Sequence, residues 1–223
     1  MTSTRDVLVA EGMRLFGERG YAATSVAQIE AAAGLSPGSG SLYKHFRSKE
    51  ALLVAGFDRL VPGGRVLADQ LDSPDSAGLV EQLTIVARAG LARMEEDREV
   101  NRLLFRGLES FPELLQRFGN EEIGRFHQAT TALLSELAGD RAGAVDWAAV
   151  AAVLQGATAH YWLLADVFGR HPTGVDEDRF VAGLVALTVA VLTGAPSTEQ
   201  VPADVAETAE MAADRRETSR ETR

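Results

Sequence analysis

Three side chains that can hydrogen-bond to an anion stand close together near residue 45. Tyr43, His45 and Lys49 bring a phenol, an imidazole and an ammonium group into one short stretch. Lys49 also follows Ser48 at the predicted start of a helix, and the amino terminus of a helix favours anions. Groups of this kind contact the phosphates of nucleic acids and fix the position of a protein on a duplex. We therefore expect a phosphate-contacting edge here.

A glycine-rich segment, "GLSPGSGS" over residues 34–41, comes directly before these side chains. Its glycines and serines keep the backbone slim, so that main-chain N–H groups and hydroxyls can approach phosphates and base edges. Ser39, Gly40 and Ser41 are predicted to lie at this approach. Leu42 and Phe46 are four residues apart, and we expect them to pin the small helix that follows to the helices before it.

The first predicted helix is expected to pack behind this phosphate-contacting edge and to hold it in position. Its apolar face includes Phe16, and it ends at Gly20, a residue suited to the left-handed position after a helix. Tyr21 then lies where its ring can fold back onto Phe16. The spacing thus predicts a helix that stops at Gly20 with an aromatic contact across the stop.

A second short helix is predicted to begin at Thr24 or Ser25. Ser25 and Gln28 have the spacing of a capping box, and Gly34 closes the helix. Two short helices separated by a glycine-centred turn make a helix-turn-helix, whose second helix enters the major groove of DNA while the first crosses the backbone.

The same segment resembles the amino-terminal DNA-binding domain of TetR-family transcriptional regulators. The resemblance lies in "LFGERGYAATSVAQIEAAAGLS" and "SLYKHFRSKEALL" and covers about the first 55 residues. It implies phosphate contacts by Tyr43, His45 and Lys49, a groove-facing Ser41, and a backbone contact by Thr24 or Ser25. The complete set of predicted DNA-binding residues is Thr24, Ser25, Gln28, Ser39, Gly40, Ser41, Tyr43, Lys44, His45 and Lys49.

The chain departs from the family pattern in two places. The segment between the turn glycine and the Leu-Tyr pair is about two residues longer than usual. Either the turn bulges, or the recognition helix begins at Ser39 instead of Ser36. Ala27 occupies a position that is often basic or polar in the family, and Gln28 is the predicted substitute.

Beyond residue 50 the pattern remains helical, with no convincing strand alternation. Helices are expected over Ala51 to about Leu60, Leu79 to Met94, Val100 to Phe111, Ile123 to Leu137 with a break near Gly119, Trp147 to Phe168, and from Asp176 to near Gly194. Residues 196–223 contain few large apolar side chains and are predicted to be largely disordered. The sequence therefore predicts an all-α protein, with a three-helix DNA-binding domain over residues 1–50 and a larger helical domain over 51–195.

The larger domain is predicted to dimerise and to bind a small molecule, as the resemblance implies. The last helix, "RFVAGLVALTVAVLTG", is apolar nearly all round, and the helix from Trp147 carries many small residues that permit close helix approach. Together they predict a four-helix interface of a homodimer, with a buried core helix of a monomer as the alternative. Candidate ligand-binding residues are aromatic and polar side chains within apolar stripes, although such residues are also typical of an ordinary core: Phe105, Phe111, Phe126, His127, Thr130, Tyr161, Trp162 and Phe168.

Composition limits the other function classes. The net charge is −10, yet residues 1–50 hold six Lys/Arg and five Asp/Glu, so the acidity lies in the rest of the chain. Cysteine is absent and the four histidines are scattered, so we expect no enzyme activity, no cofactor and no metal site. The longest apolar stretch, residues 180–192, is shorter than the roughly 18–20 residues that cross a bilayer, and no secretory signal is visible. A cytoplasmic location without membrane attachment is predicted.

The sequence thus favours a ligand-responsive transcriptional regulator. In this hypothesis a homodimer represses by binding a palindromic double-stranded operator, and a small-molecule effector releases it. The alternative is a helical module that binds a small molecule or a protein partner and carries a degenerate DNA head.

Overall fold

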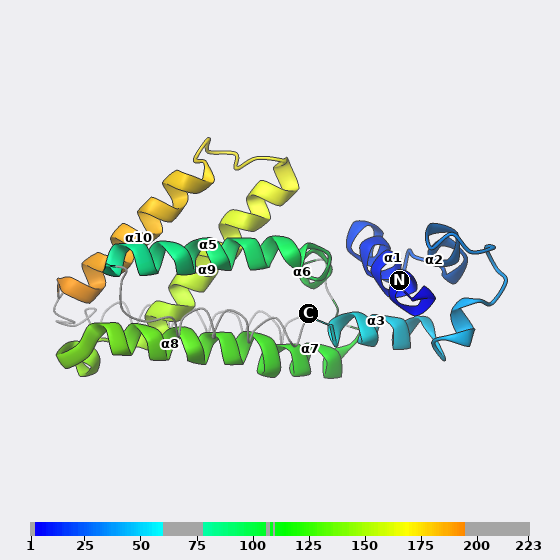
Figure 1. Cartoon of the computed structure of the whole chain (residues 1–223), viewed down its shortest axis with the longest axis horizontal. Helices are drawn as coiled ribbons and strands as arrows, with labels where there is room; N and C mark the ends of the chain where they lie inside the picture. The colour runs from blue at the N-terminus through cyan, green and yellow to red at the C-terminus, as the bar shows by residue number, and fades with distance from the viewer. Residues whose placement is uncertain (1–2, 60–77, 106–107, 109, 195–223) are drawn as a thin grey trace, which may run out of the picture.

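The computed structural model describes residues 3–59, 78–105, 108 and 110–194. Within these ranges every regular element is a helix, as predicted (Figure 1). The amino-terminal elements are α1 (Thr4–Arg19), α2 (Val26–Ala32), the 3-10 helix η1 (Leu42–Lys44) and α3 (Lys49–Phe57). The larger part contains α5 (Leu79–Glu96), α6 (Arg98–Phe105), α7 (Pro112–Phe118), the π-helix η2 (Gly119–Ile123), α8 (Gly124–Ala138), the 3-10 helix η3 (Gly139–Ala144), α9 (Trp147–Phe168) and α10 (Glu177–Thr193).

Capping explains where the amino-terminal helices begin and end. The Ser25 hydroxyl accepts a hydrogen bond from the backbone N–H of Gln28, and the Gln28 side chain accepts one from the backbone of Ser25, which confirms the predicted capping box. At the end of α1, Gly20 has a φ of 86° and its N–H donates to the carbonyl of Phe16. The rings of Phe16 and Tyr21 are 5.1 Å apart, so the predicted contact across the helix stop is confirmed.

One hydrophobic cluster joins the amino-terminal helices to α6 and α7. Leu42, Leu52 and Phe16 are fully buried in it, and Val100 and Leu103 of α6 belong to the same cluster. Figure 1 shows α6 standing between α5 and α1. The helix α3 packs into this cluster along its whole length. Dividing the chain at residue 50 would therefore cut through α3, which begins at Lys49.

A second cluster forms the core of the larger part. It is built from α5, α8, α9 and α10, where α8 packs on α9 and α5 packs on both α9 and α10. Trp147, Ala151 and Trp162 of α9 are buried there with Val181 and Val185 of α10. Figure 1 shows α1 to α3 at one end of the molecule and α10 toward the other, so this core lies away from the amino-terminal helices.

The helices between the two clusters differ from the prediction in their bounds. The helix expected over Val100 to Phe111 is the shorter α6, and Pro112 begins α7, because proline at the first position of a helix forfeits no hydrogen bond. The break expected near Gly119 is a π-helical turn between α7 and α8. The end of the helix predicted at about Leu60 and the predicted tail over 196–223 lie outside the described residues.

Candidate nucleic-acid interface and effector groove

The predicted recognition helix is not an α-helix. Residues 36–45 form successive turns and the short η1, with Ser39 N–H donating to the Ser36 carbonyl at 3.2 Å and Tyr43 N–H donating to the Gly40 carbonyl at 3.0 Å. Gly38 and Gly40 both have a φ of 73°, a conformation that residues with side chains rarely adopt. Of the two alternatives left open by the longer segment, the chain adopts the bulged turn, and neither Ser36 nor Ser39 begins a helix.

The outer side of this turn carries most of the predicted polar groups. The Tyr43 side chain is 58% exposed, and Lys44 and His45 are exposed beside it. Ser39 is exposed and Ser41 is half-buried, and their hydroxyl oxygens are 2.7 Å apart in a hydrogen bond. The turn therefore presents hydroxyls and cations on one edge, which is the chemistry that phosphates and base edges require.

Two buried side chains hold the turn against the helices behind it. Leu42 is fully buried and Phe46 is 5% exposed, as their spacing predicted. The guanidinium carbon of Arg5, at the start of α1, lies 4.9 Å from the centre of the Phe46 ring. Arg5 and the exposed Arg47 thus add cations to the same edge. Neither was among the predicted DNA-binding residues: Arg5 lies far from the motif in sequence, and Arg47 lies within it but was given no role.

Thr24 does not lie at this edge, contrary to the prediction. Its side chain is 1% exposed, and its hydroxyl donates to the backbone carbonyls of Gly20 at 2.9 Å and Leu15 at 3.2 Å. These carbonyls belong to the end of α1, where the helix leaves acceptors without partners. The Thr24 hydroxyl is therefore bonded inside the head, whereas Ser25 and Gln28 remain exposed at the start of α2.

The side chain of Lys49 also has hydrogen-bond partners inside the head. Its ammonium donates to the carbonyls of Tyr21 at 2.8 Å and Thr24 at 2.7 Å, and it lies 4.1 Å from the centre of the Tyr21 ring. Burial lowers the pKa of this ammonium group. The ammonium is directed at the connection between α1 and α2, which departs from the predicted phosphate contact.

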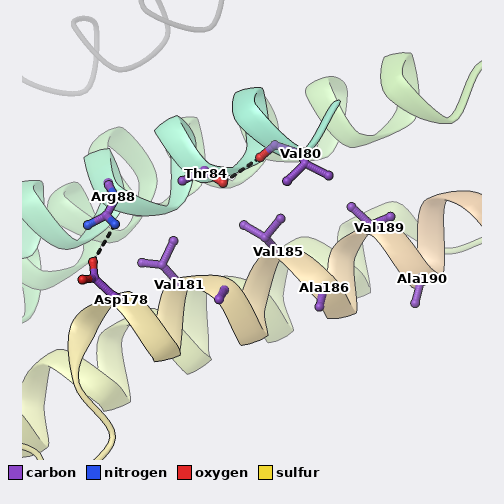
Figure 2. Close-up of a pocket in the computed structure, with 10 residues that line it drawn as sticks. Val80, Thr84, Arg88, Asp178, Val181, Val185, Ala186, Val189 and Ala190 are labelled. Carbon is purple, nitrogen blue, oxygen red and sulfur yellow. Dashed lines mark hydrogen bonds and ion pairs between the residues drawn. The ribbon is translucent and has the colours of Figure 1, made fainter. Parts of the chain in front are cut away.

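A groove runs between α5 and α10 in the larger part (Figure 2). Val80, Thr84 and Arg88 form one wall, since residues four apart share a face of α5. The wall from α10 consists of small and branched apolar residues below Asp178: Val181, Ala182, Val185, Ala186, Val189 and Ala190. At one end Arg88 pairs with Asp178 at 2.6 Å. The volume is about 540 Å³, within the roughly 300–1,000 Å³ range of small-ligand sites.

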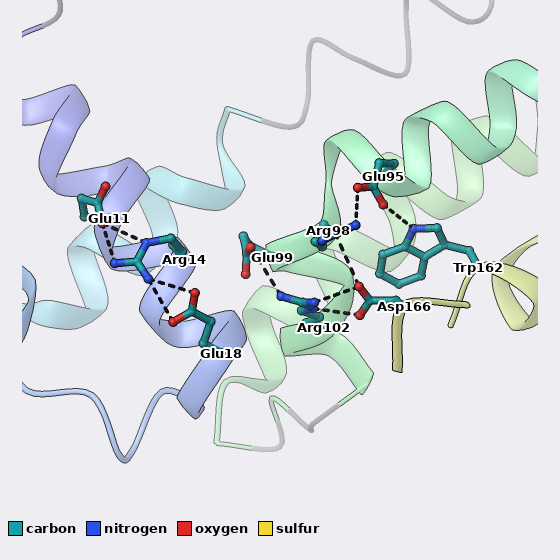
Figure 3. A network of polar contacts seen from close by, with 9 residues as sticks. All are labelled: Glu11, Arg14, Glu18, Glu95, Arg98, Glu99, Arg102, Trp162 and Asp166. Carbon is teal, nitrogen blue, oxygen red and sulfur yellow. Dashed lines mark hydrogen bonds and ion pairs between the residues drawn. The ribbon is translucent and has the colours of Figure 1, made fainter. Parts of the chain in front are cut away.

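A polar network connects α9 to α6 and to the end of α5 (Figure 3). The Asp166 side chain, 5% exposed, accepts two hydrogen bonds from Arg102, from Nε at 2.8 Å and from Nη2 at 2.9 Å. Trp162 donates its indole N–H to Glu95 at 3.1 Å, and Glu95 also pairs with Arg98. Both arginines lie on α6, so these bonds fix α6 relative to α9.

The opposite side of α6 touches α1 at a close backbone contact. A Cβ atom placed on Gly17 would stand 2.9 Å from the carbonyl oxygen of Glu99 and 3.0 Å from its Cα. Burial raises the pKa of the Glu99 carboxyl, and one of its oxygens has no hydrogen-bond partner. The two helices therefore approach as closely as glycine allows.

A carboxylate at the junction of α5 and α6 has a strongly shifted pKa. Burial raises the pKa of Asp97 to about 6, although Arg93 donates to it at 2.6 Å and opposes the shift. Glu96 and Glu122 add negative charge nearby, and burial raises the pKa of Glu122 as well. Across the described ranges no group of three or more His, Asp or Glu side chains could hold a metal ion.

Comparison with known proteins places this chain among bacterial regulators. Residues 8–55 match the sequence profile of the tetR family of bacterial regulatory proteins. An HTH-type transcriptional regulator of Bacillus subtilis strain 168, YerO, is 38% identical over 55 residues, which are 25% of this chain and 18% of the relative. Residues 8–55 of this chain are thus similar to the amino-terminal domain of TetR-family regulators.

Solved structures extend the similarity of this chain to its larger part, as a likeness of fold. A TetR-like regulator from Rhodococcus sp. RHA1 superposes with a TM-score of 0.66 at 19% identity, covering 87% of this chain and 98% of the other. FadR from Bacillus subtilis, solved with stearoyl-CoA, gives 0.60 at 18% identity, covering 85% and 98%. The likeness of fold thus covers most of this chain.

The predicted ligand-binding residues do not line the groove. Phe105 and Phe168 are more than half exposed, at 51% and 61%. Phe111 packs with its ring centre 4.7 Å from that of Tyr21, in the amino-terminal cluster.

The remaining predicted ligand-binding residues have internal partners. The Tyr161 hydroxyl donates to the Val175 carbonyl at 3.2 Å, and Trp162 belongs to the polar network described above. Between α8 and α9, Gln155 bonds to both His127 and Thr130, and Phe126, half-buried on the same helix, accepts the Thr130 hydroxyl on its carbonyl. The groove was missed because valine and alanine at helical spacing look like ordinary core.

Proposed function

We propose that this chain is a homodimeric repressor that binds a palindromic operator and releases it when a mainly apolar molecule occupies the groove. The DNA-contacting edge carries this conclusion. Tyr43, Lys44 and His45 are exposed on one turn, and the buried Leu42 and Phe46 hold that turn rigidly on α1 and α2. The match of residues 8–55 to the tetR family of bacterial regulatory proteins supports the class of target, which is double-stranded DNA.

The proposed contacts sort into two kinds. Cations and hydroxyls around η1 meet phosphates, and the serine-glycine segment meets base edges. Ser25 and Gln28 lie at the exposed start of α2, where backbone N–H groups also favour a phosphate. The proposed set is Arg5, Ser25, Gln28, Ser39, Gly40, Ser41, Tyr43, Lys44, His45 and Arg47.

The homodimer is supported by apolar side chains that one chain leaves exposed. Val153 and Val167 of α9 are 70% and 63% exposed, and Leu187 of α10 is 68% exposed. By length and composition α9 could cross a membrane, and only 17% of its most apolar stretch is buried. A helix at a subunit interface has the same properties, and the TetR-family head of this chain favours that explanation and a cytoplasmic location. A second copy would also place two heads about 34–36 Å apart, one turn of DNA.

The effector is proposed to bind in the groove between α5 and α10. Its walls are mainly alanine and valine, so the ligand is mainly apolar, and Arg88 at one end suits an anionic or hydrogen-bonding group. Solved structures of similar fold include FadR from Bacillus subtilis in complex with stearoyl-CoA, whose acyl chain is apolar, and a regulator named FrrA that is called flavonoid-responsive. In this chain, the proposed effector site is supported by the groove between α5 and α10.

The proposed route from groove to DNA runs through α6. The groove wall on α5 continues to Glu95, which bonds to both Trp162 of α9 and Arg98 of α6. The far side of α6 touches α1 at Gly17. A ligand that binds better when α5 and α10 are further apart would shift α6 and thereby the heads, which requires a differential affinity of only about 1–3 kcal/mol.

Selection from a random duplex library tests the DNA-binding part. The intact protein is expected to enrich a two-fold symmetric sequence and to bind it with an affinity that falls steeply as salt is raised. The alternative, a helical binding module with a degenerate head, is favoured by the absence of a regular recognition helix within residues 36–45. Enrichment of no sequence, with only weak salt-dependent binding, would establish that alternative.

Fluorescence of 1-anilinonaphthalene-8-sulfonate tests the groove, because this probe is an apolar aromatic anion. Ala186→Trp fills the groove from α10 and should remove most of the probe's fluorescence enhancement. Ala32→Trp, an exposed position at the end of α2, is the control and should leave it unchanged. Equal enhancement in both variants would place the probe elsewhere and contradict a groove site.

A further inference from the structure

Glu30 is a fully buried carboxylate directly behind the DNA-facing turn. It lies in the last turn of α2, at 0% exposure, among residues that are otherwise apolar. Its oxygen Oε2 accepts the backbone N–H of Gly38 at 2.7 Å, and Oε1 accepts the backbone N–H of Leu42 at 3.0 Å. One side chain therefore binds both ends of the segment from Gly38 to Leu42.

Burying the Glu30 carboxylate at this position costs free energy that other interactions must offset. An ionised carboxylate loses its hydration on burial, and the carboxyl end of a helix repels negative charge. The partners found for the Glu30 side chain are the two backbone amides. Hydrogen bonds to a charged group are stronger than neutral ones, so together they offset this cost and strongly favour one conformation of the turn.

The turn needs such a template because its own hydrogen bonds are few. It has two glycines with a φ of 73° and none of the repeating bonds of an α-helix. The backbone carbonyl of Glu30 also accepts the N–H of Leu35 at 2.8 Å, which fixes the chain where it leaves α2. Between the two amides held by the carboxylate lie Ser39 and Ser41, whose hydroxyls bond to each other.

We propose that Glu30 is a positioning residue for DNA recognition and that its carboxylate templates a non-helical base-reading loop, residues 38–42. In this arrangement hydroxyls and peptide groups of the loop meet the base edges, where a recognition helix would otherwise lie. The longer segment of this chain then forms the loop, and the buried Glu30 carboxylate holds that loop in its conformation. The inference rests on the DNA-binding function proposed above.

Glu30→Gln tests the proposal, with Glu50→Gln as its matched control. Both variants remove one negative charge from the head, but Glu50 is exposed on the first turn of α3 and has no part in the turn. Each protein is measured against the duplex that the wild type selects and against mixed-sequence duplexes. The preference of Glu30→Gln for the selected duplex should fall about 10- to 100-fold, the effect of losing a buried hydrogen bond to a charged group.

The affinity for mixed-sequence DNA distinguishes positioning from loss of the fold. Removing a negative charge should leave this affinity unchanged or slightly higher in both variants, because it depends on charge and not on loop geometry. Loss of both affinities together in Glu30→Gln would indicate an unfolded head. In that case amide exchange in the wild type decides: the Gly38 and Leu42 amides, which donate to Glu30, should exchange more slowly than the amide of Gly40 between them.

The outcomes separate this inference from the proposed function. A wild type that selects no sequence overturns both. A wild type that selects a sequence which Glu30→Gln binds with unchanged preference overturns the role of Glu30 alone. Equal exchange rates for the Gly38, Gly40 and Leu42 amides would overturn it as well, since the carboxylate would then hold neither end of the loop.

Discussion

At the scale of single residues, the two lysines near η1 have opposite surroundings. The ammonium of Lys44 is exposed on the DNA-facing turn, whereas the ammonium of Lys49 donates to two backbone carbonyls inside the head. Proximity in sequence and identical chemistry suggested one role for both. The difference arises because Lys49 begins α3 next to the connection between α1 and α2, where its ammonium reaches the carbonyls of Tyr21 and Thr24.

Substituting each lysine by methionine should separate these roles. Lys44→Met removes a phosphate contact, so the slope of log affinity against log salt should fall by about 0.9 for each head, with stability changed by less than about 0.5 kcal/mol. Lys49→Met should instead lower the free energy of unfolding by roughly 2 kcal/mol, because two carbonyls lose a charged donor. Urea unfolding and salt titrations of DNA binding measure both. An equal loss of slope in the two variants would show that the Lys49 ammonium reaches a phosphate.

The raised pKa of Asp97 predicts that the stability of the fold depends on pH. Its pKa is about 6 in the folded chain against about 3.9 when unfolded, so the folded state holds the proton more tightly. Its stabilising effect is therefore complete below about pH 4 and is lost as the pH rises through 6. Asp97→Asn keeps the neutral form at every pH, so its stability relative to wild type should improve by roughly 1–2 kcal/mol between pH 4.5 and pH 8.

Urea unfolding at both pH values and one protein concentration measures this difference. Asp140→Asn makes the same change of residue type at an exposed site of η3 and serves as the control. A difference between Asp97→Asn and wild type that is the same at pH 4.5 and pH 8 would mean that Arg93 compensates for burial completely.

At the scale of helices, the sequence predicted those elements that local signals specify. The capping box at Ser25, the stop at Gly20 and the long helix from Trp147 all appeared where expected, because each depends on residues adjacent in the chain. The DNA-facing turn could not be predicted in this way. Its form depends on Glu30, and the spacing that brings Glu30 to Gly38 and Leu42 becomes evident only in three dimensions. The groove depends likewise on α5 meeting α10, far apart in sequence.

The contact between α1 and α6 can be tested with one methyl group. In Gly17→Ala the new Cβ would meet backbone atoms of Glu99, which cannot rotate away. Alanine gains up to about 1 kcal/mol of helix propensity, but overpacking costs typically 1–3 kcal/mol, so the two helices should separate slightly. The free energy of unfolding should fall by about 1 kcal/mol, and the preference for the selected duplex should fall more than in Gly90→Ala.

Gly90 is the matched control because it also lies inside a helix. A Cβ there would stand 3.7 Å from Thr158, an ordinary contact, so Gly90→Ala should gain the propensity without the clash. A stabilised Gly17→Ala with unchanged DNA binding would show that α6 can move away from α1 at no cost. It would also remove the proposed route by which the groove reaches the heads.

At the scale of the whole molecule, the exposed apolar surface and DNA recognition both favour pairing with a second copy of the chain. One chain presents one head, and one turn of about five residues can read only a few base pairs. The apolar side chains left exposed on α9 and α10 lie on helices that belong to the core distant from the head. Covering them with a second copy buries that surface and supplies the second head at the same time, which gives the two-fold symmetry that a palindromic site requires.

Leu187→Glu should therefore yield a folded monomer that has lost specific DNA binding. A carboxylate on α10 at a two-fold interface meets its own copy, and both charges would have to be buried. The wild type should sediment at twice the 23.8 kDa of one chain, and the variant at that mass, with unchanged helical circular dichroism. Ile85→Glu adds the same charge at an exposed apolar position on α5 and should stay dimeric. If Leu187→Glu also remained dimeric and bound the selected duplex fully, α10 would lie outside the interface, and the two heads would have to be paired through a different surface.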